Sequence, residues 1–229
     1  MTDRFSSRVI LLDIEGTVAP ISFVHDVLFP YARTRMEAYL RQHWSDPAVA
    51  AARAMLDDSA CDVSEPSLAS LNQKLFRLMD ADVKSTGLKQ LQGMIWDEGY
   101  HAGHLQSPVF PDVPAALARW KESGKTIAIY SSGSVAAQKV FFQYTNSGDL
   151  TPYLSAHFDT TTGPKKSSDS YAKIASVLGV SPADILFISD VAEELEAAGT
   201  AGMPGLIAAR PGNTPLVPGK FPVIYSFDD

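Results

Sequence analysis

Short runs of consecutive apolar residues recur along the chain and predict buried β-strands. The first run covers residues 9–12 (Val-Ile-Leu-Leu) and shows no alternation of polar and apolar positions. This pattern is typical of strands covered on both faces of a parallel sheet. Three similar runs follow at residues 126–130, 185–188 and 205–209. The sequence therefore predicts four strands of this kind.

Apolar residues at helical spacing lie between these runs. A helix with Leu117 and Trp120 on one face is expected after Asp112, a candidate N-cap. A second helix, over residues 171–178, is expected to end before Gly179, a candidate C-cap. Strands that alternate with helices are typical of right-handed βαβ units. We therefore expect an α/β fold: a doubly wound parallel sheet with a Rossmann-type core.

Residues 21–108 contain helical spacing but no strand pattern. Leucines at positions 68, 71, 75 and 78 form one helical stripe, and Leu88, Leu91 and Ile95 begin another. We therefore expect a helical domain of residues 21–108, inserted into a core domain of residues 1–20 and 109–229.

Composition narrows the classes of function. The chain has 229 residues, 19 Lys and Arg against 26 Asp and Glu, a net charge of −7 and one cysteine. An acidic chain is a poor candidate for binding nucleic acid or an anionic membrane, so neither partner is expected. No apolar run is long enough for a membrane span, and the first eight residues do not resemble a signal peptide. Together with the single cysteine, this predicts a cytoplasmic protein.

Polar residues that suit phosphoryl transfer follow the predicted strands. In an open parallel sheet, ligands bind beyond the carboxyl ends of the strands. Phosphoryl transfer needs a nucleophile, oxygen ligands for a hard cation, and donors around the phosphate oxygens. The residues after the strand ends, and in one Gly-Pro loop, are Asp13 with Glu15, Ser131 with Ser132, Lys165, and Asp190. Taken alone, each has a simpler explanation as a turn, capping or surface residue.

The ordered set of these motifs resembles the haloacid dehalogenase superfamily of phosphatases. A narrower resemblance, to the enolase-phosphatase family of methionine salvage, covers nearly the whole chain. The stretches that carry it are residues 13–24, 92–96, 130–134, 158–160 and 210–213. Glu15 stands where most phosphatases of the superfamily have Asp, and the enolase-phosphatases share this Glu. The resemblance implies that the helical insert is a cap domain.

The resemblance implies a division of roles around one Mg²⁺ ion per chain. Asp13 would be the nucleophile that forms an aspartyl-phosphate, and would also bind the metal. Glu15 would act as general acid and base, with its backbone carbonyl on the metal. Asp190 would complete the metal site, because Mg²⁺ prefers carboxylate, carbonyl and water oxygens.

Further residues would bind the substrate. Ser131 and Ser132 would bind phosphate or substrate oxygens, and Lys165 would hold the phosphate and neutralise Asp13. The implied substrate is 2,3-diketo-5-methylthiopentyl-1-phosphate, which is first enolised and then dephosphorylated to an acireductone. Phe23 and Trp96 are candidate walls for its methylthio tail.

Two alternatives remain open from the sequence. One is a phosphatase of the same superfamily that acts on another small phosphate ester. The other is a receiver-type phospho-accepting domain, although there an acidic pair precedes the accepting Asp and no helical insert is present. The sequence does not distinguish the roles of Glu193 and Glu194. A small-molecule phosphate ester is the expected partner, and a monomer is the expected state.

Overall fold

The computed structural model describes the chain except for residues 1–4, 57–63, 82, 84, 214–218 and 229. It divides into two compact units: residues 1–24 with 106–229, and residues 25–105. These limits lie close to the expected limits at residues 20/21 and 108/109. Within the described residues, none of the helices is both long and apolar enough to cross a membrane.

The first unit is built on a six-stranded, entirely parallel sheet with the order β3-β2-β1-β4-β5-β6. The predicted doubly wound sheet is therefore confirmed. The strands are β1 (Val9–Leu12), β2 (Thr126–Tyr130), β3 (Ala156–Phe158), β4 (Ile185–Ser189), β5 (Gly205–Ala208) and β6 (Val223–Ile224). The four predicted runs correspond to β1, β2, β4 and β5, while β3 and β6 were not predicted.

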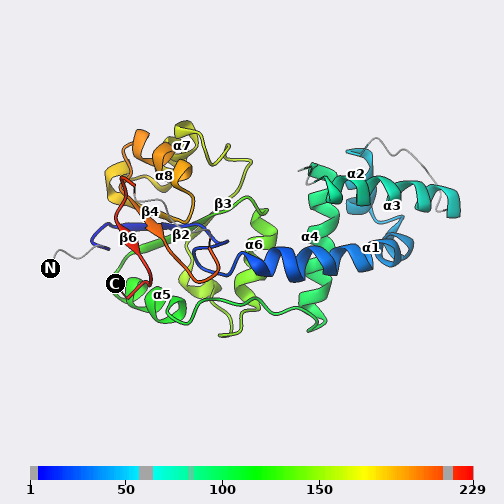
Figure 1. Cartoon of the computed structure of the whole chain (residues 1–229), viewed down its shortest axis with the longest axis horizontal. Helices are drawn as coiled ribbons and strands as arrows, with labels where there is room; N and C mark the ends of the chain where they lie inside the picture. The colour runs from blue at the N-terminus through cyan, green and yellow to red at the C-terminus, as the bar shows by residue number, and fades with distance from the viewer. Residues whose placement is uncertain (1–4, 57–63, 82, 84, 214–218, 229) are drawn as a thin grey trace. The chain divides into compact units, whose positions relative to one another are not determined.

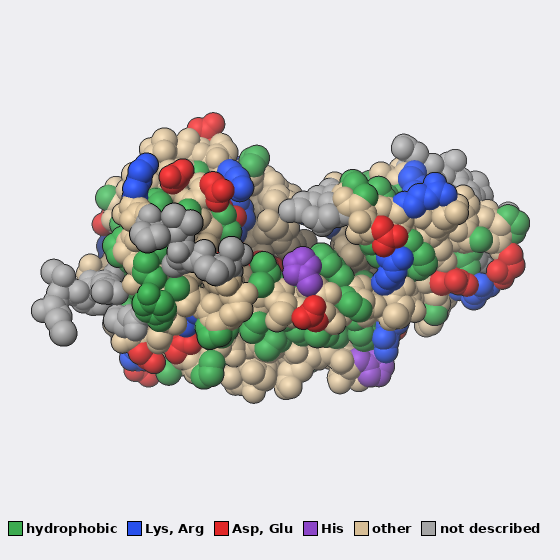
Figure 2. Space-filling view, viewed as in Figure 1, with side chains coloured by type: hydrophobic (Ala, Val, Ile, Leu, Met, Phe, Trp, Pro, Cys, Tyr) green, Lys and Arg blue, Asp and Glu red, His purple; other side chains and the backbone are tan. Residues whose placement is uncertain are grey.

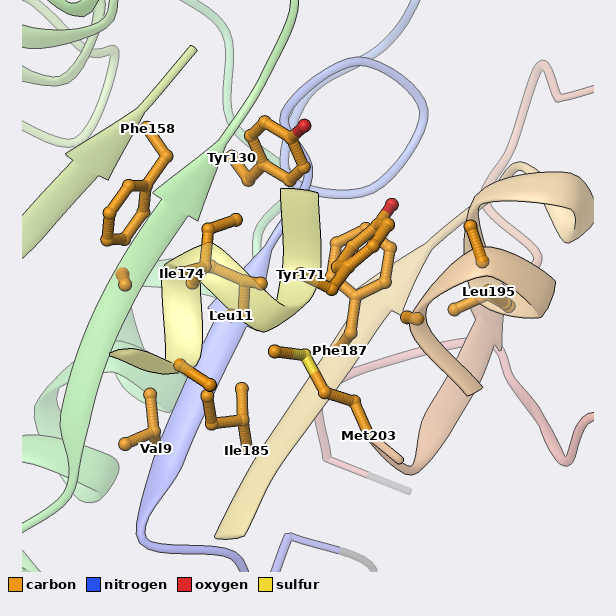
Figure 3. Close-up of a cluster of buried hydrophobic side chains, with 14 of the residues drawn as sticks. Val9, Leu11, Tyr130, Phe158, Tyr171, Ile174, Ile185, Phe187, Leu195 and Met203 are labelled. Carbon is orange, nitrogen blue, oxygen red and sulfur yellow. The ribbon is translucent and has the colours of Figure 1, made fainter. Parts of the chain in front are cut away.

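Helices cover both faces of this sheet (Figure 1). On one face, α7 (Ser168–Leu178) and α8 (Ala192–Thr200) pack over alternate strand residues. Figure 3 shows this layer, where Tyr171, Ile174 and Leu195 lie over Leu11 and Phe187. On the other face, α5 (Val113–Glu122) packs against β2, and α6 (Val135–Gln143) packs against β3. Because both faces are covered, β1 is apolar at every position, and β2 and β4 carry a polar residue only at one end, Thr126 and Ser189.

Two predicted helix ends can be compared with the structure. Gly179 ends α7 in the left-handed conformation, with φ of 67°, as expected of a C-cap glycine. Asp112 stands at the N-cap position of α5, but its side chain does not cap the helix. Its carboxylate instead accepts hydrogen bonds from Arg210 and from the backbone N–H of Phe227. Tertiary contacts with the end of the chain therefore replace the predicted cap.

The second unit is helical. A five-residue π-helix, η1 (Val24–Leu28), leads into α1 (Phe29–His43), so Pro30 lies in the first turn of α1 rather than interrupting it. The remaining helices are α2 (Pro47–Ala54), α3 (Glu65–Asp80) and α4 (Thr86–His101). The predicted leucine stripes supply its apolar core: Leu68, Leu71 and Leu75 of α3 pack with Leu88, Leu91 and Ile95 of α4.

Candidate active site

The carboxyl ends of β1, β2 and β4 lie at the same edge of the sheet. The residues that directly follow these strands are three of the predicted site residues: Asp13, Ser131 and Asp190. Leu12 pairs with Ile129 on one side and with Ile188 on the other. The residues that follow these strands therefore leave the sheet at the same level. The backbone N–H of Asp13 continues the ladder to the carbonyl of Ile188 at 3.0 Å.

Lys165 forms a buried ion-pair cluster with two carboxylates at this edge. Its Nζ lies 2.6 Å from Asp13 Oδ1 and 2.7 Å from Glu194 Oε2, and the three side chains are 8%, 4% and 10% exposed. Burial alone would lower the pKa of Lys165, but Asp13 and Glu194 raise it above its usual value. Lys165 is therefore a permanent cation beside Asp13. Tyr171 OH fixes the loop by donating to the Lys165 carbonyl at 2.6 Å.

The two oxygens of Asp13 have different partners. Oδ1 accepts from Lys165 and from the backbone N–H of Ile14 at 2.8 Å. Oδ2 has a longer contact, 3.3 Å, with Ser189 Oγ. That hydroxyl also lies 3.0 Å from Glu194 Oε2 and can donate its one proton to either carboxylate. Oδ2 is therefore the less engaged oxygen of Asp13.

Glu15 reaches across to the loop that follows β2. Ser131 Oγ donates to Glu15 Oε2 at 3.0 Å and accepts from the backbone N–H of Gly133 at 3.2 Å. Ser131 is fully buried and Ser132 is exposed. Burial raises the pKa of Glu15, and the charge of Asp13 raises it further. Glu15 is therefore suited to hold a proton close to Asp13.

Residues 13–17, which follow β1, are called the catalytic loop below. Asp190 lies directly beside this loop. Gly16 has φ of 72°, and a Cβ at this position would overlap the carboxylate of Asp190. Burial, followed by the charges of Asp13 and Glu194, raises the pKa of Asp190 to about 7. Burial, followed by the charge of Asp13, also raises the pKa of Glu194 to about 7.

These residues fit a cation of the Mg²⁺ type. Four carboxylates, Asp13, Glu15, Asp190 and Glu194, interact electrostatically with the single ammonium group of Lys165. Negative charge is therefore in excess, and a divalent cation would reduce the repulsion. Among the described residues, no group of three or more His, Cys, Asp or Glu side chains has the geometry of a metal site. Mg²⁺ takes one or two carboxylates and completes its coordination with waters and phosphate oxygens.

The turn after β5 holds the catalytic loop by two side-chain hydrogen bonds, a role that the sequence did not predict. Asn213 Nδ2 donates to the Gly16 carbonyl at 2.8 Å, and Arg210 Nε donates to the Thr17 carbonyl at 3.0 Å. The only signal in the sequence is the stretch 210–213, which carries part of the family resemblance but predicts no role. Ser189 was likewise missed as a partner of Asp13.

Other predicted residues lie apart from this cluster. Phe23 belongs to the first unit, where it is buried in an edge-to-face contact with Phe141, at 6.3 Å between ring centroids. Trp96 belongs to the second unit, where its indole N–H donates to the Leu28 carbonyl at 2.8 Å and its ring stacks on Phe29. The use of Phe23 and Trp96 as pocket walls stays a prediction.

The structure distinguishes the two adjacent glutamates, Glu193 and Glu194, whose roles the sequence left open. Lys166 and Glu193 are both exposed and lie 4.0 Å from one another. Their neighbours Lys165 and Glu194 are the buried pair. Only the second residue of the Glu pair therefore belongs to the cluster.

Comparisons with known proteins decide the family. The family model for haloacid dehalogenase-like hydrolases matches residues 7–202. Enolase-phosphatase E1 of Synechococcus elongatus is 46% identical over 233 residues, which covers 98% of each chain. Enolase-phosphatase E1 of Drosophila persimilis is also 46% identical and covers 94% of this chain and 89% of its own. The chain belongs to the enolase-phosphatases, within the haloacid dehalogenase-like hydrolases.

Solved structures agree with this family. The Unknown transcript 4 protein of Saccharomyces cerevisiae is 36% identical, with a TM-score of 0.83 over 97% of this chain and 99% of that one. CbbY of Rhodobacter sphaeroides is 15% identical with a TM-score of 0.60 over 97% and 96% of the two chains, and it shares the fold. This enolase-phosphatase is therefore an enzyme, a hydrolase of the phosphatase type, from a family whose members are generally Mg²⁺-dependent.

Proposed function

We propose that the protein converts 2,3-diketo-5-methylthiopentyl-1-phosphate to an acireductone, by enolisation and then dephosphorylation through Asp13. The observation that carries this proposal is the arrangement at the sheet edge, where Lys165 lies 2.6 Å from Asp13 and Asp190 lies against Gly16. The names of the relatives, Enolase-phosphatase E1, support the bifunctional assignment.

In the phosphatase step, Asp13 attacks phosphorus and the ester oxygen leaves. Oδ2 is the attacking oxygen, because Oδ1 is already engaged by Lys165 and Ile14. The Glu15 carboxyl protonates the departing oxygen, and the resulting carboxylate then removes a proton from the water that hydrolyses the aspartyl-phosphate. Lys165 stabilises the charge on the phosphate oxygens as it develops.

Asp13, Asp190 and the backbone carbonyl of Glu15 would hold the metal, one Mg²⁺ per chain. When bound, Mg²⁺ would offset the repulsion between the carboxylates and the incoming phosphate and polarise the phosphoryl oxygens. The raised pKa of Asp190 supports this assignment, since it reflects burial of the carboxylate and, after burial, the nearby charges of Asp13 and Glu194.

In the enolisation step, a proton leaves the carbon next to the carbonyl group. Glu15 is the base, because its raised pKa makes its carboxylate a stronger proton acceptor than an ordinary carboxylate. The exposed Ser132 binds a substrate oxygen, and Phe23 and Trp96 stay candidates for contact with the methylthio tail. The helical unit, residues 25–105, is the expected cap domain.

The substrate is a small anion rather than a polyanion. The chain is acidic, and acidic and basic side chains are interspersed over the visible face (Figure 2). The cationic group at the site is the buried Lys165 rather than an extended basic surface. A monomer in the cytoplasm stays our expectation.

The test supplies the diketo phosphate anaerobically and records enol absorbance and phosphate release in the same reaction. We expect a transient enol before phosphate appears. In Asp13→Asn, enol should still form and phosphate release should stop. Asp169→Asn, an exposed aspartate at the start of α7, is the matched control and should retain both signals.

Three outcomes would contradict the proposal. Phosphate release without a transient enol would favour a phosphatase of another ester. Stable phosphorylation without turnover would favour a phospho-accepting domain. Loss of both signals in a folded, metal-binding Asp13→Asn would show that the division of roles between Asp13 and Glu15 is wrong.

A further inference from the structure

Gln138 is a buried polar residue that the proposed reaction does not use. It lies on α6 and is 2% exposed. Its Nε2 donates to the Gly133 carbonyl at 2.9 Å and to the Phe158 carbonyl at 2.8 Å. Gly133 belongs to the loop after β2, and Phe158 is the last residue of β3. One amide group therefore joins the helix to two segments at the carboxyl edge of the sheet.

The orientation of this amide is fixed by a third contact. His157 Nδ1 lies 3.2 Å from Gln138 Oε1. Because both amide hydrogens are used by carbonyls, Oε1 must accept and His157 Nδ1 must carry the proton. The opposite orientation would set Oε1 against two carbonyl oxygens. Gln138 is therefore held in one orientation from three sides.

The loop that Gln138 holds leads directly to Glu15. The carbonyl of Gly133 binds Gln138, and its N–H donates to Ser131 Oγ at 3.2 Å. Ser131 Oγ in turn donates to Glu15 Oε2 at 3.0 Å. A continuous chain of hydrogen bonds thus runs from Gln138 through the loop to the carboxyl group of Glu15.

We infer that Gln138 is a positioning residue for the general acid. By fixing Gly133, it keeps Ser131 in place and so holds Glu15 where it can protonate the departing oxygen. The inference rests on the proposed role of Glu15. It assigns no contact between Gln138 and substrate.

A purely structural role for Gln138 predicts a different result, and the leaving group distinguishes the two. A general acid matters most when the departing oxygen is a poor leaving group, as in an alkyl phosphate. It matters least for p-nitrophenyl phosphate, whose leaving group needs little protonation. A preparation that is partly unfolded loses activity on both substrates by the same factor, so the ratio of the two activities is unchanged.

The experiment measures kcat/KM of Gln138→Met on p-nitrophenyl phosphate and on propyl phosphate, by phosphate release. Met keeps the length of the side chain and removes both donors. We expect the activity on propyl phosphate to fall roughly tenfold more than that on p-nitrophenyl phosphate, a fraction of the full effect of a general acid. Gln143→Met makes the same change at an exposed position of the same helix and should leave both activities unchanged.

Glu15→Gln serves as the benchmark, and Gln138→Ala, which leaves room for water, serves as a second variant. If Glu15→Gln is selective against propyl phosphate while both Gln138 variants lose the two activities equally, or lose neither, the inference is overturned and the proposed function stands. If Glu15→Gln itself shows no such selectivity, Glu15 is not the acid, and the proposed mechanism and this inference both fall.

Discussion

At the scale of single residues, Gly16 shows how closely the site is built. Its φ of 72° is a conformation that favours glycine, and the place of its missing side chain is occupied by the carboxylate of Asp190. The positive φ of Gly16 and the close approach of Asp190 therefore both require a residue without a side chain at this position. Only glycine lets the catalytic loop lie against Asp190.

We predict that Gly16→Ala lowers kcat/KM by about 100-fold or more, because the methyl group would displace Asp190 from the loop. Steady-state kinetics with Mg²⁺ measures this loss.

Gly124→Ala is the matched control. Gly124 has φ of 77° in the same unit, and no atom lies within 4 Å of its added Cβ. It should cost about 1–2 kcal/mol of stability and leave kcat/KM unchanged. Equal activity of the two variants would contradict the account.

At the scale of elements, Arg210 joins segments that are distant along the chain. Its guanidinium lies 2.8 Å from Asp112 at the start of α5 and donates to the Tyr225 carbonyl at 3.1 Å. It also lies over the rings of Phe110 and Phe227, at 4.9 and 4.3 Å from their centroids. Since Arg210 also holds the Thr17 carbonyl, the end of the chain supports the catalytic loop.

Arg210→Met should lower the free energy of unfolding by about 3–5 kcal/mol, because it leaves the largely buried Asp112 carboxylate without its cation. Adding Asp112→Asn should recover part of this loss, since the neutral amide needs no counter-charge. Urea unfolding of the two variants checks both statements.

Arg119 provides the matched control for this prediction. It pairs with Asp228 at the same distance of 2.8 Å, but both side chains are about half exposed. Arg119→Met should therefore change stability by less than about 1 kcal/mol. If Arg210→Met costs no more than Arg119→Met, the buried pair does not join these elements as described.

The elements also show what could be predicted from the sequence. The strands β1, β2, β4 and β5 were predicted because burial on both faces makes them continuous apolar runs. The strands β3 and β6 were not predicted, because they stand at the edges of the sheet and have only three and two residues. Short edge strands carry no pattern that distinguishes them from a loop.

The site likewise contains residues that could be predicted from the sequence and residues that could not. Asp13, Ser131 and Asp190 could be predicted because each directly follows a buried strand. Lys165 stands in a loop, and its pairing with Asp13 required the family resemblance. Gln138 acts through contacts with Gly133 and Phe158, which are 5 and 20 positions away, and Arg210 acts through contacts with segments far apart in sequence. Arg210 is 193 positions from its partner Thr17, and spacing along the chain holds no signal for such a contact.

At the scale of the whole molecule, the metal-free protein carries a surplus of negative charge at its active site. The pKa values of Asp190 and Glu194 are about 7, above the ordinary values of 3.8 and 4.5. The folded protein therefore binds these protons more tightly than the unfolded chain does. Its stability should accordingly fall as the pH rises from about 4 to about 7. The acidic groups of the site therefore lower the stability of the metal-free protein at neutral pH.

Thermal unfolding in a chelator between pH 5 and pH 8 tests this pH dependence of stability. Wild type should lose stability across this range, and Asp190→Asn should lose roughly 2 kcal/mol less, allowing for the partial exposure of Asp190. Mg²⁺ at pH 8 should then stabilise wild type more than the variant. Glu193→Gln, which removes an exposed carboxylate of α8, should follow wild type. Identical pH profiles for wild type and Asp190→Asn would contradict the prediction.

The most direct test of the central claim is to locate the covalent intermediate. Wild-type protein is acid-quenched during turnover with Mg²⁺ and substrate, digested, and analysed by mass spectrometry. The account predicts one added phosphoryl group, on the peptide that contains Asp13, and none in Asp13→Asn. A phosphoryl group on another residue, or steady turnover with no labelled peptide under quench conditions that preserve acyl phosphates, would contradict it.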